Sequence, residues 1–183
     1  MHSLTGHFLV AGPSLEDPNF AKAVVLMVQH DGDGAMGLVI NRPTELSLPE
    51  LWLQVKQESC SLSGVVYRGG PCEGPLMALH GSEQAAQLEA LPGVFFCADA
   101  DQLQWLVDSG AKRARFFVGY SGWGAGQLER ELSEDAWFVV PASAEQVFED
   151  DASLWGRLVR LASLSRDVPS LRPRIIPDDP SLN

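Results

Sequence analysis

The sequence predicts one α+β domain with a mixed, largely antiparallel sheet flanked by helices. Strand-like apolar runs occur in groups between isolated amphipathic helices, and the regular strand–helix alternation of a doubly wound parallel sheet is missing. The chain has 183 residues, 45% of them apolar, which is enough for a single core. We assign residues 1–164 to this domain and residues 165–183, rich in proline and arginine, to a C-terminal tail.

The N-terminal part of the chain predicts three strands. They cover residues 7–11, 23–29 and 36–41, where apolar and β-branched side chains follow one another. Turn-forming residues at 17–20 separate the first two strands, and the glycine-rich loop 31–34 joins the second and third into a hairpin. Arg42-Pro43 is expected to end the third strand.

Residues 46–56 carry the clearest helix signal. Ser47 and Glu50 can form a capping box, in which each side chain accepts a hydrogen bond from the other residue's backbone N–H. Four apolar residues then recur at helical spacing and are expected to face the core: Leu48, Leu51, Trp52 and Val55.

The rest of the chain predicts further strands and helices in irregular order. Strands are expected at residues 65–68, 76–80, 94–98, 116–120 and 137–140. Helices are expected after the capping residue Asp99, over residues 127–132, and over an amphipathic stretch between Leu154 and Ala162.

Charge and cysteine content disfavour several classes of protein. The 24 acidic and 13 basic residues give a net charge of -11, which repels phosphate backbones and disfavours direct nucleic-acid binding. The basic cluster Lys112, Arg113 and Arg115 is interpreted as a solvated face. Three widely spaced cysteines favour reduced thiols in the cytoplasm over a disulfide framework or a zinc site. No apolar run is long enough to cross a bilayer.

The densest signal is the glycine-rich segment 115–131, which we interpret as a turn between a strand and a short helix. Residues 119–123 resemble the nucleophile elbow of serine hydrolases, but Trp123 stands where that motif needs glycine. The glycines that follow do not complete a dinucleotide or phosphate loop. The sequence therefore favours a structural turn and predicts no catalytic residue, cofactor or metal.

Six residues remain as candidates for binding a ligand or partner: Asp17, Arg42, Tyr120, Ser121, Trp123 and Gln127. Arg42 follows an apolar strand and can fork onto a carboxylate, either a ligand's or that of an internal residue such as Asp17. Tyr120 and Trp123 either cover the core or, if Trp123 is exposed, anchor a partner, because tryptophan and arginine are over-represented in binding hot spots.

In combination, the motifs of the chain resemble the YqgE/AlgH family of bacterial proteins. The resemblance covers roughly residues 4–162. It depends on HFLVAGP and DPNF (residues 7–20), HDGDGAMGLVINRP (30–43), GGP (69–71), LH (79–80) and GYSGWGAGQLERE (119–131). It implies a single α+β domain whose mixed sheet is partly curled like a barrel. It attaches no reaction or cofactor to the chain, although one branch of the family is named for the regulation of alginate production.

Three functions follow as hypotheses. The first is a non-enzymatic cytoplasmic binding or regulatory protein, with a protein partner or small anionic ligand at a surface built from Arg42, Trp123 and Gln127. The second is an enzyme or small-ligand sensor with an unusual site at the glycine-rich turn, Gly119–Gln127. Its candidate residues are His30, Arg42, Ser121 and Glu129. The third is a nucleic-acid binder that uses the basic cluster, which the net charge places last.

Overall fold

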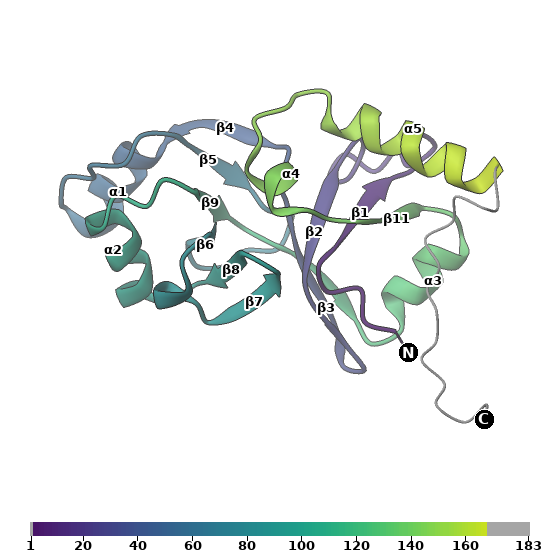
Figure 1. The fold of residues 1–183 in the computed structure, drawn as a ribbon, viewed down its shortest axis with the longest axis horizontal. Helices are drawn as coiled ribbons and strands as arrows, with labels where there is room; N and C mark the ends of the chain where they lie inside the picture. The colour runs from purple at the N-terminus through teal and green to yellow at the C-terminus, as the bar shows by residue number, and fades with distance from the viewer. Residues whose placement is uncertain (1, 168–183) are drawn as a thin grey trace.

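Two sheets form the framework of the molecule, which a computed structural model describes for residues 2–167 (Figure 1). Sheet 1 has the strand order β10-β3-β2-β1-β11, and each neighbouring pair is antiparallel. Its strands are β1 (His7–Ala11), β2 (Val24–Asp31), β3 (Gly34–Val39), β10 (Ser121–Gly124) and β11 (Trp137–Pro141).

Sheet 2 is inserted between β3 and β10 of sheet 1. Its strand order is β4-β5-β9-β6-β8-β7, and β5 pairs with β9 in parallel while the other described pairs are antiparallel. Its strands are β4 (Pro43–Ser47), β5 (Val65–Arg68), β6 (Met77–His80), β7 (Leu88–Leu91), β8 (Val94–Cys97) and β9 (Ala114–Val118). The predicted α+β class with largely antiparallel pairing is confirmed, and its strands are divided between two sheets.

Helices cover the outer faces of both sheets and fill the junction between them. They are α1 (Leu48–Lys56), α2 (Ala100–Asp108), α3 (Gln127–Ser133), α4 (Ala144–Phe148) and α5 (Leu154–Asp167), with a 3-10 turn at Glu83–Ala85. Helices α1 and α2 lie on sheet 2 at one end of the molecule, and α3 lies on sheet 1 at the other (Figure 1). Helix α4 lies between the two ends, directly before α5.

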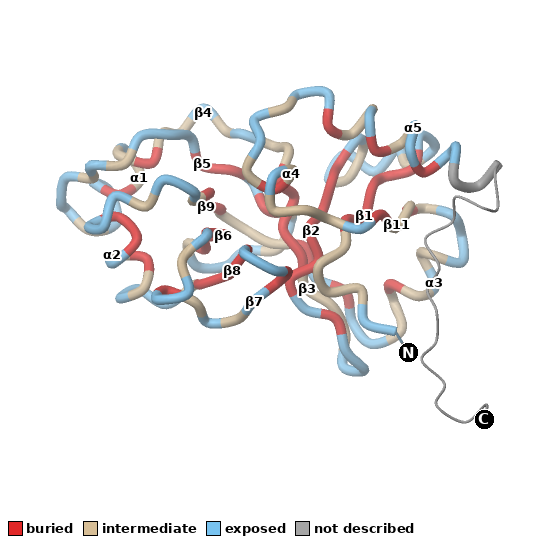
Figure 2. The backbone as a smooth tube through the Cα atoms, in the orientation of Figure 1, coloured by how far each residue is buried: buried red, intermediate tan, exposed pale blue. Residues whose placement is uncertain are grey.

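The largest core lies between the two sheets. Sheet 1 contributes Phe8 and Leu26, sheet 2 contributes Leu79 and Phe117, and α5 contributes Leu158. Two smaller cores lie beneath α1 and α2 and beneath α3. The buried residues therefore run through both sheets, while the loops and outer helix faces are exposed (Figure 2).

Two edge strands and one helix face differ from the sequence prediction. β4 begins at Pro43, which was expected to end a strand; an edge strand tolerates proline because some of its N–H groups need no ladder partner. β7, the other edge of sheet 2, was not predicted either. The capping box of α1 is confirmed, but Val55 is 59% exposed. The buried face of α1 is narrower than the predicted stripe.

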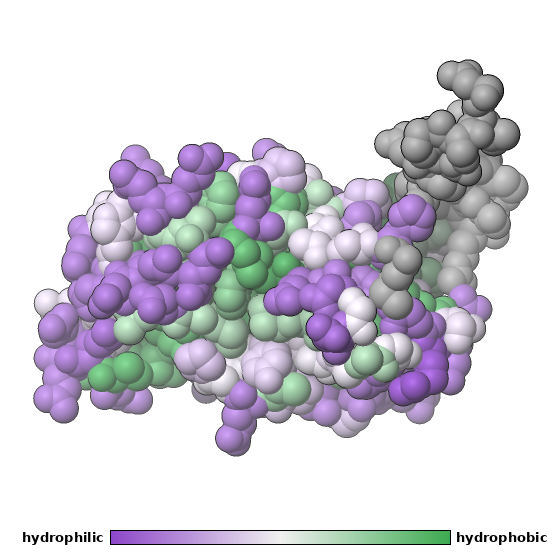
Figure 3. All heavy atoms as spheres, turned by 90° about the horizontal axis from the view of Figure 1, so that it is seen from below, coloured by the Kyte–Doolittle hydropathy of each residue, from purple (hydrophilic) through white to green (hydrophobic). Residues whose placement is uncertain are grey.

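The predicted C-terminal tail overlaps with α5, which continues to Asp167. The rest of the tail, residues 168–183, lies outside the described residues. Within residues 2–167, no helix has the length and apolar character needed to span a bilayer. The face seen from below carries hydrophilic side chains around hydrophobic ones that gather toward its middle (Figure 3).

Candidate functional site

The glycine-rich segment 115–131 contains a second strand where the sequence predicted a turn, so the prediction was wrong for residues 121–124, while the strand before them and the helix after them are confirmed. Residues 121–124 form β10 and pair with β3 at the edge of sheet 1. At Gly119, the group that approaches the glycine closely is backbone of the same chain, around Gly70 and Cys72. A Cβ atom at Gly119, where φ is +71°, would lie 2.8 Å from the Gly70 carbonyl oxygen and 2.9 Å from that of Cys72. Gly119 is therefore explained by packing between two backbone segments, whereas a Cβ at Gly124 or Gly126 would meet nothing within 4 Å.

The candidate residues on β10 and α3 bond within the chain. Ser121 is buried, and its hydroxyl donates to the Gly69 carbonyl at 3.1 Å. Trp123 is 5% exposed, and its indole N–H donates to Glu131 at 2.9 Å. Gln127 accepts from the Gly124 N–H and donates to Glu131. The indole of Trp123 therefore packs in the core beneath α3, and Ser121 is bonded as a structural hydroxyl.

The remaining candidates also have internal partners. Tyr120 packs against the main core, and its backbone pairs with Cys72. The guanidinium of Arg42 donates to the carbonyl oxygens of Asn19 and Ala21, in the turn that Asp17 opens. Arg42 thus ties the chain before β2 to the chain after β3, and no joint surface with buried Trp123 forms.

The structure brings together one pair from the enzyme hypothesis, His30 and Glu129. The His30 Nδ1 accepts the Leu4 N–H at 3.0 Å, so Nε2 carries the proton and donates to Glu129 Oε1 at 3.0 Å. Hydrogen bonds from its own backbone N–H and from His30 lower the pKa of Glu129. Arg42 lies at the opposite end of β2, roughly 20 Å away at about 3.3 Å per residue. The four enzyme candidates therefore do not form one site.

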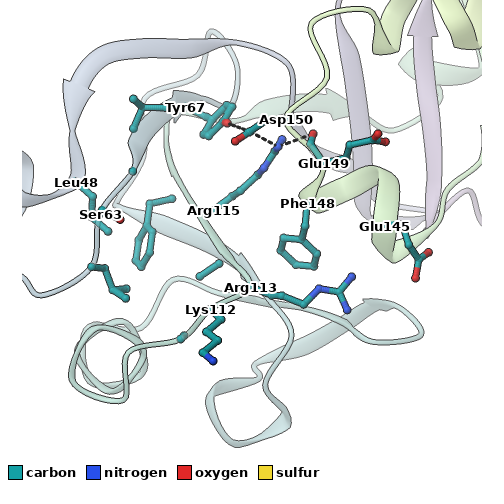
Figure 4. Close-up of a pocket in the computed structure, with 16 residues that line it drawn as sticks. Leu48, Ser63, Tyr67, Lys112, Arg113, Arg115, Glu145, Phe148, Glu149 and Asp150 are labelled. Carbon is teal, nitrogen blue, oxygen red and sulfur yellow. Dashed lines mark hydrogen bonds and ion pairs between the residues drawn. The ribbon is translucent and has the colours of Figure 1, made fainter.

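A cleft of about 470 Å³ lies elsewhere, between the start of β9 and α4 (Figure 4). We call it the Arg115 cleft. Its apolar lining comes from both sides: Leu48, Leu62, Val65, Phe116 and Phe148. Its charged lining consists of Lys112, Arg113 and Arg115 on one side and Glu145, Glu149 and Asp150 on the other. This size and mixed lining are typical of small-molecule sites.

Arg115 is the buried charge of this cleft. Its side chain donates to the Ile40 carbonyl at 2.9 Å, the Glu149 carbonyl at 2.7 Å and Asp150 Oδ1 at 2.7 Å. The guanidinium lies 4.7 Å from the Tyr67 ring centre, and the Tyr67 hydroxyl donates to the same Asp150 oxygen at 2.9 Å. Burial raises the pKa of Tyr67, which keeps this hydroxyl protonated. The interpretation of Arg115 as part of a solvated face was wrong.

The charges of the cleft that have no ion-pair partner are mainly positive. Arg115 pairs with Asp150, and Glu149 pairs with Arg157. Among the described residues, Lys112 and Arg113 have no ion pair, and Arg113 only stacks on Phe148 at 5.1 Å. The charges within each ion pair largely cancel. Of the remaining charged side chains of the cleft, Lys112 and Arg113 are positive and Glu145 is negative, and none of the three has an ion-pair partner among the described residues. In a chain of net charge -11, this cleft is locally suited to an anion.

A second cleft of about 410 Å³ lies on the other side of the Arg115–Asp150 pair. We call it the Pro43 cleft. It shares Tyr67, Arg115 and Asp150 with the Arg115 cleft and continues toward Pro43 and Leu154. The Arg115–Asp150–Tyr67 bridge thus forms a common wall.

The sequence contains one signal for this site. Arg115 interrupts the apolar strand Ala114–Val118, and arginine is almost never fully buried without a partner. Its partner Asp150 lies 35 residues away in the chain, so no local pattern predicts the pair. Within residues 2–167, no three His, Cys, Asp or Glu side chains are grouped to hold a metal ion.

Comparisons with known proteins agree on one family. The family model described as AlgH-like, DUF179, matches residues 8–166. A UPF0301 protein of Chlorobaculum tepidum is 37% identical over 162 residues, covering 85% of this chain and 84% of the relative. A UPF0301 protein of Streptomyces coelicolor is 37% identical over 195 residues, covering 99% and 96%. The solution structure of the AlgH protein of Pseudomonas aeruginosa matches with a TM-score of 0.72 and 36% identity, covering 90% of this chain and 88% of that one.

Proposed function

Given that the chain belongs to the AlgH-like family, DUF179, we propose that it is a non-enzymatic binding protein for a small anionic ligand with an apolar body. The proposed site is the Arg115 cleft, in place of the surface around Trp123 that the sequence favoured. The family name attaches no reaction to the chain, so the proposal depends on the geometry of the cleft.

The observation that carries the proposal is that two cations without an ion-pair partner among the described residues, Lys112 and Arg113, line a cleft that also has apolar side chains. Both are exposed, so they can attract an anion without a large desolvation cost. Phe148 and Val65 offer apolar surface to the rest of the ligand, and Val65 is 41% exposed although it belongs to a strand. An amphipathic organic carboxylate satisfies both features.

Hexanoate is a suitable probe, because it combines one carboxylate with a short apolar chain. Titration into ¹⁵N-labelled protein is expected to shift the amide signals of residues 62–65 and 111–116, which line the cleft. The double variant Lys112→Ala/Arg113→Ala is expected to bind hexanoate about tenfold more weakly, as loss of roughly 1.4 kcal/mol implies.

The matched control is Lys22→Ala/Arg130→Ala, which removes two exposed cations outside the cleft. It also removes two positive charges from the protein. An equal loss of affinity in both double variants would therefore show that hexanoate responds to the overall charge and not to the cations of the cleft. Hexylamine, with the opposite head group, is expected not to shift these signals. Binding of both compounds alike would contradict an anion site.

We further propose that the protein acts in the cytoplasm and that ligand binding there serves a regulatory role. Three free thiols, one of them in buried Cys97, support a reducing compartment. Burial raises the pKa of Cys97 to about 12, so this thiol is inert and unsuited to nucleophilic chemistry at neutral pH. The regulatory role requires the small-ligand site, so a failure of hexanoate to bind there would remove the basis for it.

An enzyme remains the second candidate because His30 and Glu129 form a histidine–carboxylate pair. Nε2 of His30 already carries the proton that it donates to Glu129, and the Nδ1 lone pair accepts from the Leu4 N–H, so the imidazole must release Leu4 to accept a proton from a substrate. Hydrolysis of p-nitrophenyl acetate or p-nitrophenyl phosphate that disappears in His30→Gln would favour this candidate. Equal rates of hydrolysis in wild type and His30→Gln would rule out this pair as a catalytic site.

A further inference from the structure

Asp150 occupies an anchoring point for a carboxylate inside the proposed site. Its Oδ1 atom accepts from the Arg115 guanidinium and from the Tyr67 hydroxyl (Figure 4). We propose that Asp150 is an internal stand-in for a ligand carboxylate, and that an organic carboxylate binds by displacing Asp150 from Arg115 and Tyr67. This inference rests on the proposed function for the ligand class, but it adds the anchor and the internal competitor.

The donors of this anchor stay in place without Asp150. Arg115 is 8% exposed, and its guanidinium is held by the Ile40 and Glu149 carbonyl groups. The Tyr67 ring packs against both the guanidinium and the Phe117 ring. Two donors that converge on one point, fixed by other contacts, form a preorganised receptor for a carboxylate oxygen.

The occupant, in contrast, is free to leave. The Asp150 side chain is 86% exposed and lies on the connection between α4 and α5. Its loss from the anchor exposes no apolar core, because the side chain is already largely in water. An ion pair with one exposed member contributes little net stability, so an external carboxylate can compete with it.

Displacement also changes the shape of the site. The Arg115–Asp150–Tyr67 bridge is the common wall of the Arg115 cleft and the Pro43 cleft. A ligand whose carboxylate binds Arg115 could therefore place its apolar body in either the Arg115 cleft or the Pro43 cleft. Lys112 and Arg113 would then attract the ligand, and Arg115 with Tyr67 would fix its carboxylate.

Chemical rescue tests this inference directly. Asp150→Ala removes the stand-in, and acetate is small enough to replace the lost carboxylate. In sodium chloride, Asp150→Ala is expected to melt below wild type, and sodium acetate at equal ionic strength is expected to raise its Tm by about 2–4 °C. Wild type is expected to show a much smaller difference in Tm between the two salts, because acetate must first displace Asp150 from the anchor.

Two further variants give the controls. Asp33→Ala removes a carboxylate of the exposed β2–β3 turn and is expected to show no acetate-specific shift. Asp150→Ala/Tyr67→Phe keeps the ring over Arg115 but lacks the hydroxyl, and is expected to lose most of the rescue. An acetate shift of equal size in all variants would show a general salt effect and overturn the inference.

The outcomes separate this inference from the proposed function. Hexanoate binding that depends on Lys112 and Arg113, without acetate rescue of Asp150→Ala, would overturn the inference alone. Acetate rescue without that dependence would overturn the proposed role of Lys112 and Arg113 alone. If Asp150→Ala does not fold, Asp150→Asn replaces it and is expected to bind hexanoate about fivefold more tightly than wild type. Equal or weaker binding by Asp150→Asn would contradict displacement.

Discussion

Glu131 is the residue that fixes α3 to sheet 1. Its Oε2 accepts from the indole N–H groups of Trp123 and Trp137, each at 2.9 Å, and its Oε1 accepts from Gln127 at 3.0 Å. Both indoles are buried, so the carboxylate satisfies two donors that water does not reach. The tryptophan that the sequence offered as a binding anchor is therefore part of a structural network.

Glu131→Ala is expected to lower the free energy of unfolding by about 2–4 kcal/mol, because each buried donor left unpaired costs roughly 1–3 kcal/mol. Glu131→Gln keeps one acceptor oxygen and is expected to cost less. Urea unfolding measures both, with Glu73→Ala, an exposed carboxylate, as the control. A Glu131→Ala variant as stable as the control would show that the indoles find other partners.

His80 makes stability depend on pH. It is buried and stacked on Phe95, and burial lowers the pKa of its imidazole from 6.5. His80 therefore binds a proton more readily in the unfolded chain than in the folded protein. The stability that neutral His80 contributes is fully present above about pH 6.5 and is lost as the pH falls from there through the lower pKa of the folded state.

His80→Leu is expected to reduce the decrease in Tm between pH 7.5 and pH 5.5, whatever its effect on stability at neutral pH. His7→Gln, which changes a half-buried histidine of β1, is expected to keep the wild-type decrease. Differential scanning fluorimetry at both pH values measures the difference. An unchanged decrease in His80→Leu would assign the acid sensitivity to another group.

At the scale of elements, two glycine segments pack backbone against backbone. A Cβ at Gly69 would lie 2.3 Å from the Gly119 carbonyl oxygen, whereas a Cβ at Gly124 meets nothing within 4 Å. Gly69→Ala is therefore expected to destabilise the protein by about 2 kcal/mol or more through overpacking, and Gly124→Ala to be close to neutral. Thermal unfolding of the two variants compares them directly. Equal melting temperatures would mean that the two segments separate at little cost.

Elements with local signals could be predicted from the sequence, and elements defined by distant partners could not. The capping box of α1 and the β2–β3 hairpin depend on neighbouring residues and were predicted. β10 was taken for a turn because its glycines have low strand propensity, and its identity depends on pairing with β3, far away in the chain. β4 was missed because Pro43 ends most strands and is tolerated only at an edge.

The candidate site followed the same rule. The sequence singled out residues by type, such as Trp123 and Ser121, but their burial depends on α3 and on the segment around Gly69. The Arg115 cleft is assembled from four separate parts of the chain, namely Leu48 and residues 62–67, 111–116 and 145–150. The one sequence feature that indicates this cleft is the charged side chain of Arg115 within an otherwise apolar strand.

At the scale of the whole molecule, sheet 2 is an insertion in sheet 1 and could in principle unfold separately. The main core argues against this, because Phe8 and Leu26 from sheet 1 share it with Leu79 and Phe117 from sheet 2. Neither sheet buries its inner face without the other. The site depends on this arrangement, since Arg115 of sheet 2 bonds to Ile40 directly after β3.

The two sheets are therefore expected to unfold in one cooperative step. Native-state hydrogen exchange of amides at the centres of β2 and β6 is expected to report the same free energy of opening. Phe117→Leu, at a fully buried position, is expected to lower both values equally, by about 1 kcal/mol or more. Leu53→Ala, on the exposed face of α1, is expected to change neither. If Phe117→Leu lowered only the β6 value, sheet 2 would open alone, and ligand binding at Arg115 would then report the stability of sheet 2 instead of the whole molecule.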